Sequence, residues 1–178
     1  MRNVLIASVL ILAAAISRLL PHPPNMVPIA AMALAGGVYL NKRWGMIVPL
    51  AAMLVSDAFI GFHGLMPYVY GSFAVMVFLG QWLKNHKSPT FVFGGSLASS
   101  VLFFLVTNFG VWFAGSGAFY PKTLAGLAEC YVAAIPFFRN TLVGDLAYVA
   151  MLFGAFELAK KYLGAFEPEQ EVIVTGQK

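Results

Sequence analysis

Two acidic residues in apolar surroundings carry the clearest chemical potential of this chain. Asp57 and Asp145 each lie inside a long apolar run. An ionisable group at membrane depth costs on the order of 2.5–3.5 kcal/mol, so each carboxylate needs a cation, a ligand or an aqueous cavity. Arg18 and Arg139 are predicted to lie at a similar depth, near the outer margin of the membrane. The acids are therefore either counter-ions for these arginines or groups that contact a substrate or a coupling proton.

Helical phase places further polar side chains beside these acids. At about 100° per residue, Thr141, Asp145 and Tyr148 share one face of a helix. The preceding run carries a second stripe, made up of Ser96, Ser100, Phe103 and Thr107. Small hydroxyl residues also allow membrane helices to pack closely, so this stripe fits a helix interface as well as a site.

Asn108, Trp112 and Tyr131, near the outer end of the same region, complete a candidate site for a flat or polar small molecule. The aromatic residues in this region also fit the aromatic belt at a membrane surface. The predicted substrate-binding residues are Asp57, Asn108, Trp112, Tyr131, Arg139, Asn140, Asp145 and Tyr148.

The composition indicates that the elements carrying these residues lie in a membrane. Of the 178 residues, 60% are hydrophobic and 10% are charged, and the mean hydropathy is +0.81. A soluble domain of this size could not hide so much apolar surface from water. The net charge of +4 is spread in ones and twos, which fits loops facing anionic lipid and not a nucleic-acid surface.

The hydropathy pattern predicts an all-α, polytopic membrane protein with about six transmembrane helices. The predicted spans are Val4–Leu20, Met26–Leu40, Trp44–Phe62, Tyr68–Leu83, Phe91–Ala114 and Asn140–Leu163. Crossing the hydrocarbon takes roughly 20 residues. The short second run is therefore expected to pack against its neighbours, to be tilted little, or to be locally irregular.

The connection Gly115–Arg139 is the longest, and its composition predicts an extra re-entrant or interfacial helix before the last span. Pro121 would lie near the start of this helix and Pro136 would end it. The two other connections on this side are also proline-rich. Stiff loops on the predicted outer side of the membrane, together with short turns on the cytoplasmic side, favour a cavity that opens outward and is capped by the long connection. Alternatively, the prolines only terminate membrane helices.

Basic residues define the orientation. Seven of the eleven lysines and arginines fall on one side of the predicted spans: Arg2, Lys42, Arg43, Lys84, Lys87, Lys160 and Lys161. By the positive-inside rule, both termini are cytoplasmic. Residues 1–166 are predicted to form a single membrane domain, followed by a short disordered cytoplasmic tail over residues 167–178.

Signatures of enzymes and metal sites are missing from the sequence. There is no phosphate-binding loop, no His-Glu-x-x-His helix and no Gly-x-Ser-x-Gly elbow. His22, His63 and Cys130 have no recognised metal-binding spacing. We therefore expect no catalytic residues, no metal and no cofactor.

Four segments together resemble an uncharacterised bacterial family of proposed membrane transport proteins, a domain of unknown function. They are Arg18–Asn25, Ser56–Asp57, Thr107–Trp112 and Cys130–Asp145, and the resemblance extends from about Arg18 to Lys160. That family is similar to the S components of energy-coupling factor transporters. The resemblance implies six helices that hold a vitamin-sized solute near the outer face, and a separate ATP-driven coupling module as partner. S components carry Ala-x-x-x-Ala on the first helix, whereas this chain has Ala13-x-x-x-Ser17.

These observations predict a multi-pass protein of the bacterial inner membrane that binds a small solute from outside and helps to move it inward. The alternative is a structural or assembly subunit of the membrane, whose acids only pair with arginines. A membrane enzyme acting on a lipid or isoprenoid is disfavoured by the missing motifs.

Overall fold

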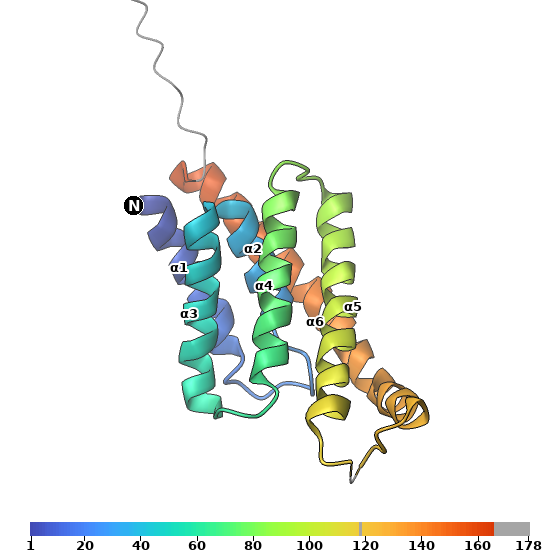
Figure 1. The fold of residues 1–178 in the computed structure, drawn as a ribbon. Coiled ribbons are helices and arrows are strands. Elements are labelled where there is room, and N and C mark those ends of the chain that lie inside the picture. Colours follow the sequence, from blue (N-terminus) through green and yellow to red (C-terminus); the bar gives the residue numbers. More distant parts are fainter. Residues whose placement is uncertain (118, 166–178) are drawn as a thin grey trace, which may run out of the picture.

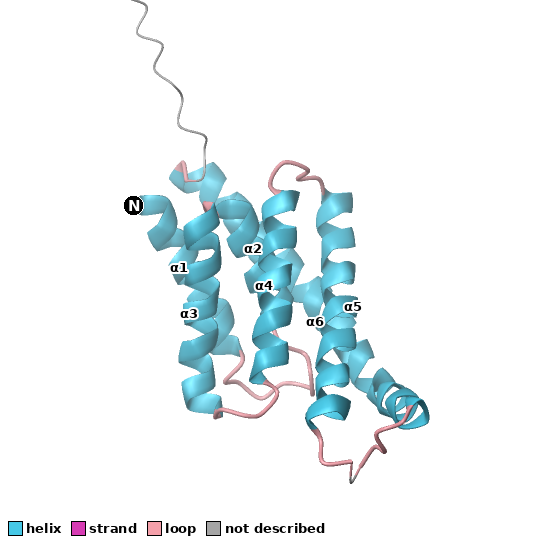
Figure 2. Ribbon diagram, viewed as in Figure 1, coloured by secondary structure: helices cyan, strands magenta, loops and turns pink. Residues whose placement is uncertain are grey.

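The described part of the chain is a bundle of helices. The computed structural model describes residues 1–117 and 119–165, which contain helices and connections but no strand (Figure 2). The helices are α1 (Arg2–Ser17), α2 (Ile29–Tyr39), α3 (Lys42–Ile60), α4 (Met66–Leu83), α5 (Pro89–Ala114) and α6 (Leu124–Leu163). Each predicted span overlaps one of them, although Asn140–Leu163 covers only the second part of α6. The predicted tail, residues 167–178, lies outside the described residues.

The connections are sorted between the two ends of the bundle. Figure 1 shows those that follow α1, α3 and α5 at one end, which we call the proline-rich end. The α2–α3 and α4–α5 connections lie at the other end, with the start of α1 and the last turns of α6. The guanidinium of Arg2 donates to the carbonyl of Gly164 at 2.7 Å, and Lys84 Nζ donates to the carbonyl of Leu40 at 3.4 Å. We call this second end the basic end, because the seven basic residues of the predicted inner side lie there, at helix ends or in the connections.

The shortest helix, α2, forms the centre of the bundle. All ten residues from Ile29 to Val38 are buried, and α2 contacts each of the other five helices. At 1.5 Å per residue its 11 residues are only about 16 Å long. An apolar helix with no polar face is stable when protein surrounds it on every side. The expectation that this short run packs against its neighbours is confirmed.

Glycines let the backbones of α2 and α4 approach each other closely. A Cβ atom added at Gly37 would lie 2.4 Å from the carbonyl oxygen of Val77, and one added at Gly80 would lie 2.5 Å from that of Leu34. Neither carbonyl can rotate away, because both are held in helices. Small residues at such crossings are the usual device by which membrane helices gain packing contacts.

Gly80→Ala should therefore lower the free energy of unfolding by about 1–3 kcal/mol, the usual cost of overpacking a filled core. Gly71→Ala is the matched control on the same helix, because a Cβ there meets no atom within 4 Å. This control should leave stability unchanged or raise it, since alanine is the better helix former. Thermal unfolding of both purified variants measures the difference, and equal melting temperatures would contradict the close contact.

Length, composition and surface indicate a membrane-associated protein. Three helices, α3, α5 and α6, are long and apolar enough to cross a bilayer, whereas α1 and α2 are shorter apolar helices. Only 22% of the apolar window of α5 is buried inside the bundle, so most of it must face another apolar medium. Large apolar side chains exposed on the outside include Leu5, Val55, Phe59, Phe78 and Met151. The described residues thus hold fewer candidate spans than the six that the sequence predicts.

The predicted re-entrant helix before the last span is wrong as a separate element. Residues from Leu124 onward belong to α6, which runs for 40 residues through Pro136 to Leu163. Its start is set by Thr123, whose hydroxyl accepts a hydrogen bond from the amide of Gly126 at 3.1 Å. A proline inside a helix removes one backbone hydrogen bond, and it can either bend the helix or end it. Figure 1 shows the first turns of α6 pointing in a different direction from the rest.

Candidate functional site

The first buried acid, Asp57, is paired with a cation. Its Oδ1 lies 2.7 Å from Nη2 of Arg18, and its Oδ2 accepts a hydrogen bond from the hydroxyl of Tyr70 at 2.7 Å. Arg18 follows the last turn of α1, Asp57 lies near the end of α3, and Tyr70 lies in the first turns of α4. Both carboxylate oxygens are therefore occupied by side chains from neighbouring helices.

Arg18 is held from a second direction as well. Its Nη1 donates to the hydroxyl of Ser56 and contacts the sulfur of Met53 at 3.3 Å. The Arg18 and Asp57 side chains are only 9% and 4% exposed. This neutral, hydrogen-bonded cluster joins three helices near the proline-rich end. Its geometry fits the counter-ion alternative for Asp57.

The second buried acid, Asp145, has a different environment. It lies on α6, is 4% exposed, and accepts a hydrogen bond from the hydroxyl of Ser100 on α5 at 2.6 Å. Among the described residues no lysine, arginine or histidine forms an ion pair with it. Arg139, the predicted partner, is exposed. A buried carboxylate with a neutral donor and no cation is costly to maintain, which makes Asp145 the strongest candidate for a functional group.

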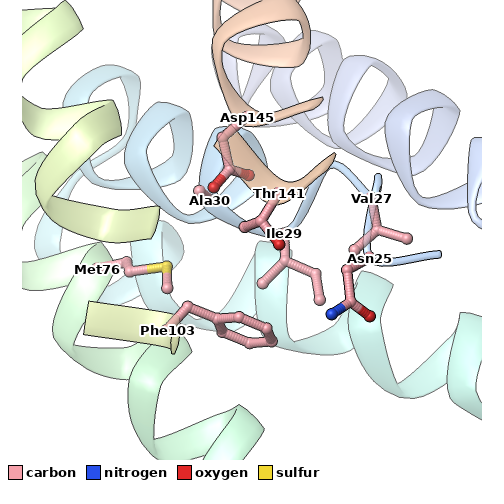
Figure 3. Close-up of a pocket in the computed structure, with 8 residues that line it drawn as sticks. All are labelled: Asn25, Val27, Ile29, Ala30, Met76, Phe103, Thr141 and Asp145. Atoms are coloured by element: carbon pink, nitrogen blue, oxygen red, sulfur yellow. The ribbon is translucent and has the colours of Figure 1, made fainter. Parts of the chain in front are cut away.

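A small cavity adjoins Asp145 (Figure 3). Its lining residues are Asn25, Val27, Ile29, Ala30, Met76, Phe103, Thr141 and Asp145. Asn25 and Val27 come from the α1–α2 connection at the proline-rich end, and the other residues come from α2, α4, α5 and α6. The cavity has a volume of about 10 Å³, which is room for about one water molecule. In this conformation the site is closed, and none of the described residues of the connection between α5 and α6 (115–117 and 119–123) lines it.

Asn25 has an unusual backbone conformation at the edge of this cavity. Its φ of 63° is the left-handed region, which asparagine adopts more readily than most residues. The adjacent carbonyl of Pro24 accepts a hydrogen bond from Nδ2 of Asn140 on α6 at 3.0 Å. The predicted residue Asn140 thus fastens the connection that covers the cavity, although it does not line the cavity itself.

The other predicted site residues lie apart from the cavity lining. Asn108 donates to the carbonyl of Phe104 at 2.8 Å, which is a bond within α5. The Trp112 indole donates to the carbonyl of Pro121 at 2.9 Å, and the Tyr131 hydroxyl donates to that of Leu105 at 2.8 Å. These last two bonds fasten the start of α6 and its preceding connection to α5.

Tyr148, the remaining predicted residue, faces α1. Its hydroxyl accepts a hydrogen bond from Ser17 at 3.4 Å. Thr141, from the same predicted stripe, lines the cavity, and Ser100 and Phe103 of the second stripe reach Asp145 or its cavity. The two stripes therefore meet at this acid. No polar pattern in the sequence indicated Asn25 or Met76.

A metal role finds no support in the described ranges, where no three His, Cys, Asp or Glu side chains are grouped closely enough to hold an ion.

In the part of the chain that the structure describes, the fold and the buried acids define an all-helical, membrane-associated protein with one buried carboxylate that has no cation partner. A family of unknown function (DUF6580) matches residues 1–169, so the chain belongs to that family. Neither a curated protein nor a solved structure matches the chain.

Proposed function

We propose that this protein is an integral membrane transport protein that binds a small solute from the outer side and helps to move it inward. The observation that carries the proposal is the state of the Asp145 carboxylate. This group is buried at the edge of a cavity, and no described cation pairs with it. Packing alone gains nothing from such a group, because an apolar residue of the same size avoids the desolvation cost. A solute that supplies the missing positive charge or N–H donors accounts for its presence.

The chemistry of the cavity indicates what such a solute offers. The Asp145 carboxylate accepts from Ser100 and retains further acceptor sites, and the Thr141 hydroxyl lies on the same lining. Met76 and Phe103 provide apolar walls. We infer a vitamin-sized solute with a cationic or amide-type nitrogen and an apolar body.

Binding requires the site to open. Ligand cavities usually measure about 300–1,000 Å³, whereas the cavity at Asp145 has about 10 Å³. The α1–α2 connection, which bears Asn25 and Val27, is the cover that has to move, because it lies at the proline-rich end while the other walls are helices. A ligand shifts the equilibrium between the closed and the open cavity only if it binds the open state more tightly than the closed one.

The proposal includes an orientation. With the basic end in the cytoplasm, the seven basic residues obey the positive-inside rule, both termini lie inside, and the Asp145 cavity opens outward. The chain then passes through a bacterial inner membrane six times. The short α2, about 16 Å long, spans only part of the roughly 30 Å of hydrocarbon, and its neighbours surround it there.

The similarity to S components suggests a separate ATP-driven coupling module as partner. Ala13 and Ser17, the positions of the altered small-residue pattern, line a groove between α1 and α6 together with Tyr148 and Met151. A transporter without such a module is the second form of the proposal.

The alternative of a structural or assembly subunit is favoured by one observation: both carboxylate oxygens of Asp57 are paired, one with Arg18 and the other with Tyr70. Under this alternative both acids serve the fold alone.

Thermal unfolding of the purified protein with a panel of vitamin-sized solutes separates the two functions. A specific solute at 100 times its dissociation constant stabilises the folded state by about 2.7 kcal/mol. We expect stabilisation by at least one solute bearing a cationic or amide nitrogen, and none by its analogue lacking that nitrogen. Stabilisation by no member of the panel, or equal stabilisation by both analogues, would favour the structural subunit.

A further inference from the structure

A second hollow lies at the basic end, on the outside of the bundle between α2, α5 and α6. It has a volume of about 450 Å³ and is lined by residues that include Tyr39, Lys87, Val92, Phe153, Gly154 and Lys160. This volume falls within the usual range for small-molecule sites. The hollow, which we call the basic groove, shares no lining residue with the Asp145 cavity.

One end of the basic groove is positively charged. Lys87 forms an ion pair with Glu157, and Lys160 contributes a second ammonium to the same lining. Two lysines against one carboxylate leave a net positive charge. The N-terminus of α5 follows directly at Ser88 and Pro89, and the dipole of this helix adds a partial positive charge. This end of the groove therefore favours an anion.

The Lys87–Glu157 ion pair does not prevent an anion from binding. The two side chains are 31% and 49% exposed, and ion pairs with such access to solvent contribute little to stability. Glu157 also accepts a hydrogen bond from the Tyr39 hydroxyl at 2.7 Å, so it retains a partner when Lys87 turns away. Lys87 already lies over the Tyr39 ring, 3.9 Å from its centroid.

The other end of the basic groove is apolar and open. Val92 and Phe153 form its wall, and a Cβ added at Gly154 would meet no atom within 4 Å. Gly154 precedes Lys160 by six residues on α6, which is about 9 Å along the helix. A ligand that fits both ends has an anionic head and an apolar body that extends away from the basic end.

We propose that the basic groove binds one anionic phospholipid, with its phosphate at Lys87 and Lys160 and the first part of an acyl chain along Val92, Phe153 and Gly154. Basic hollows between membrane helices suit such headgroups, and each lysine near an anionic membrane surface adds to the attraction. The site depends on membrane association and is independent of solute transport.

Native mass spectrometry of the full chain, released from micelles containing equal amounts of phosphatidylglycerol and phosphatidylcholine, tests the proposal. The wild-type protein should retain one phosphatidylglycerol in preference to phosphatidylcholine. The Lys87→Gln/Lys160→Gln variant should retain it at least about tenfold less, because both phosphate contacts are lost. Gly154→Phe, which fills the apolar end without changing any charge, should have the same effect.

Two matched variants serve as controls. Lys42→Gln removes a charge at the basic end outside the groove lining, and Gly94→Phe adds a ring to α5 where a Cβ meets no atom within 4 Å. Both should retain the lipid like the wild type. Equal retention of the two lipids, or full retention by the double lysine variant, would overturn the proposal. Displacement by millimolar glycerol phosphate would overturn it too, because the site would then recognise a soluble phosphate.

Discussion

Arg18→Met should lower the free energy of unfolding by about 3–5 kcal/mol, because it leaves the Asp57 carboxylate buried without its cation. The two side chains are 9% and 4% exposed, so water cannot replace the lost partner. Methionine preserves much of the length and apolar stem of arginine, so the loss reflects charge and hydrogen bonds more than volume. Thermal and denaturant unfolding of the purified protein measure the effect.

Two further variants test whether the pair itself is responsible. Tyr70→Phe removes one donor to the same carboxylate and should cost about 1.5–3 kcal/mol, the usual range for a hydrogen bond to a charged group. Arg18→Met combined with Asp57→Leu removes both charges and should regain most of the stability that the single substitution loses. A double variant as unstable as Arg18→Met alone would show that packing of the arginine, and not its charge, holds α1 against α3.

The positions of the helices could be predicted from hydropathy, because each apolar run is bounded by prolines or by basic residues. The run Tyr68–Leu83, for example, becomes α4 from Met66 to Leu83. The long connection was predicted less well. Pro136 was expected to end a helix, yet α6 continues through it. A sequence window cannot distinguish a bend from an end, since the lost backbone bond can be compensated by packing with other helices.

The pairing of the acids was only partly predictable. Arg18 was expected at the level of Asp57, and the structure joins them. Judged only by predicted depth in the membrane, Arg139 was as good a partner for Asp145 as Arg18 was for Asp57. However, six residues on one helix differ by about 600°, which leaves the two side chains on different faces. This argument was available from spacing alone.

The partners of Asp145 depended on the tertiary arrangement. Ser100 lies 45 residues away on α5. The polar stripe of α5 faces Asp145 because α5 packs against α6, and this packing cannot be deduced from the sequence of either helix. Asn25 reaches the cavity from a connection, where no periodicity predicts direction. The stripes indicated which faces are polar, and only helix packing determined which faces meet.

Asp145→Asn should weaken binding or uptake of the stabilising solute by about tenfold or more, which corresponds to about 1.4 kcal/mol for one lost charge-assisted contact. Asparagine preserves the shape of the side chain and can still accept the Ser100 hydrogen bond. The melting temperature without solute should stay the same or rise, because the substitution removes a buried charge that has no cation. Uptake per folded molecule and thermal unfolding are measured on the same preparation.

Glu157→Gln is the matched control on the same helix, because it removes an acid at the basic end that is half exposed and paired with Lys87. It should leave solute binding unchanged. Ser100→Ala tests the donor and should weaken binding less than Asp145→Asn, since the carboxylate remains and only its orientation is loosened. If Asp145→Asn instead lowers the melting temperature while uptake per folded molecule is unchanged, Asp145 stabilises the bundle and does not contact a solute. The structural-subunit alternative then accounts for both buried acids.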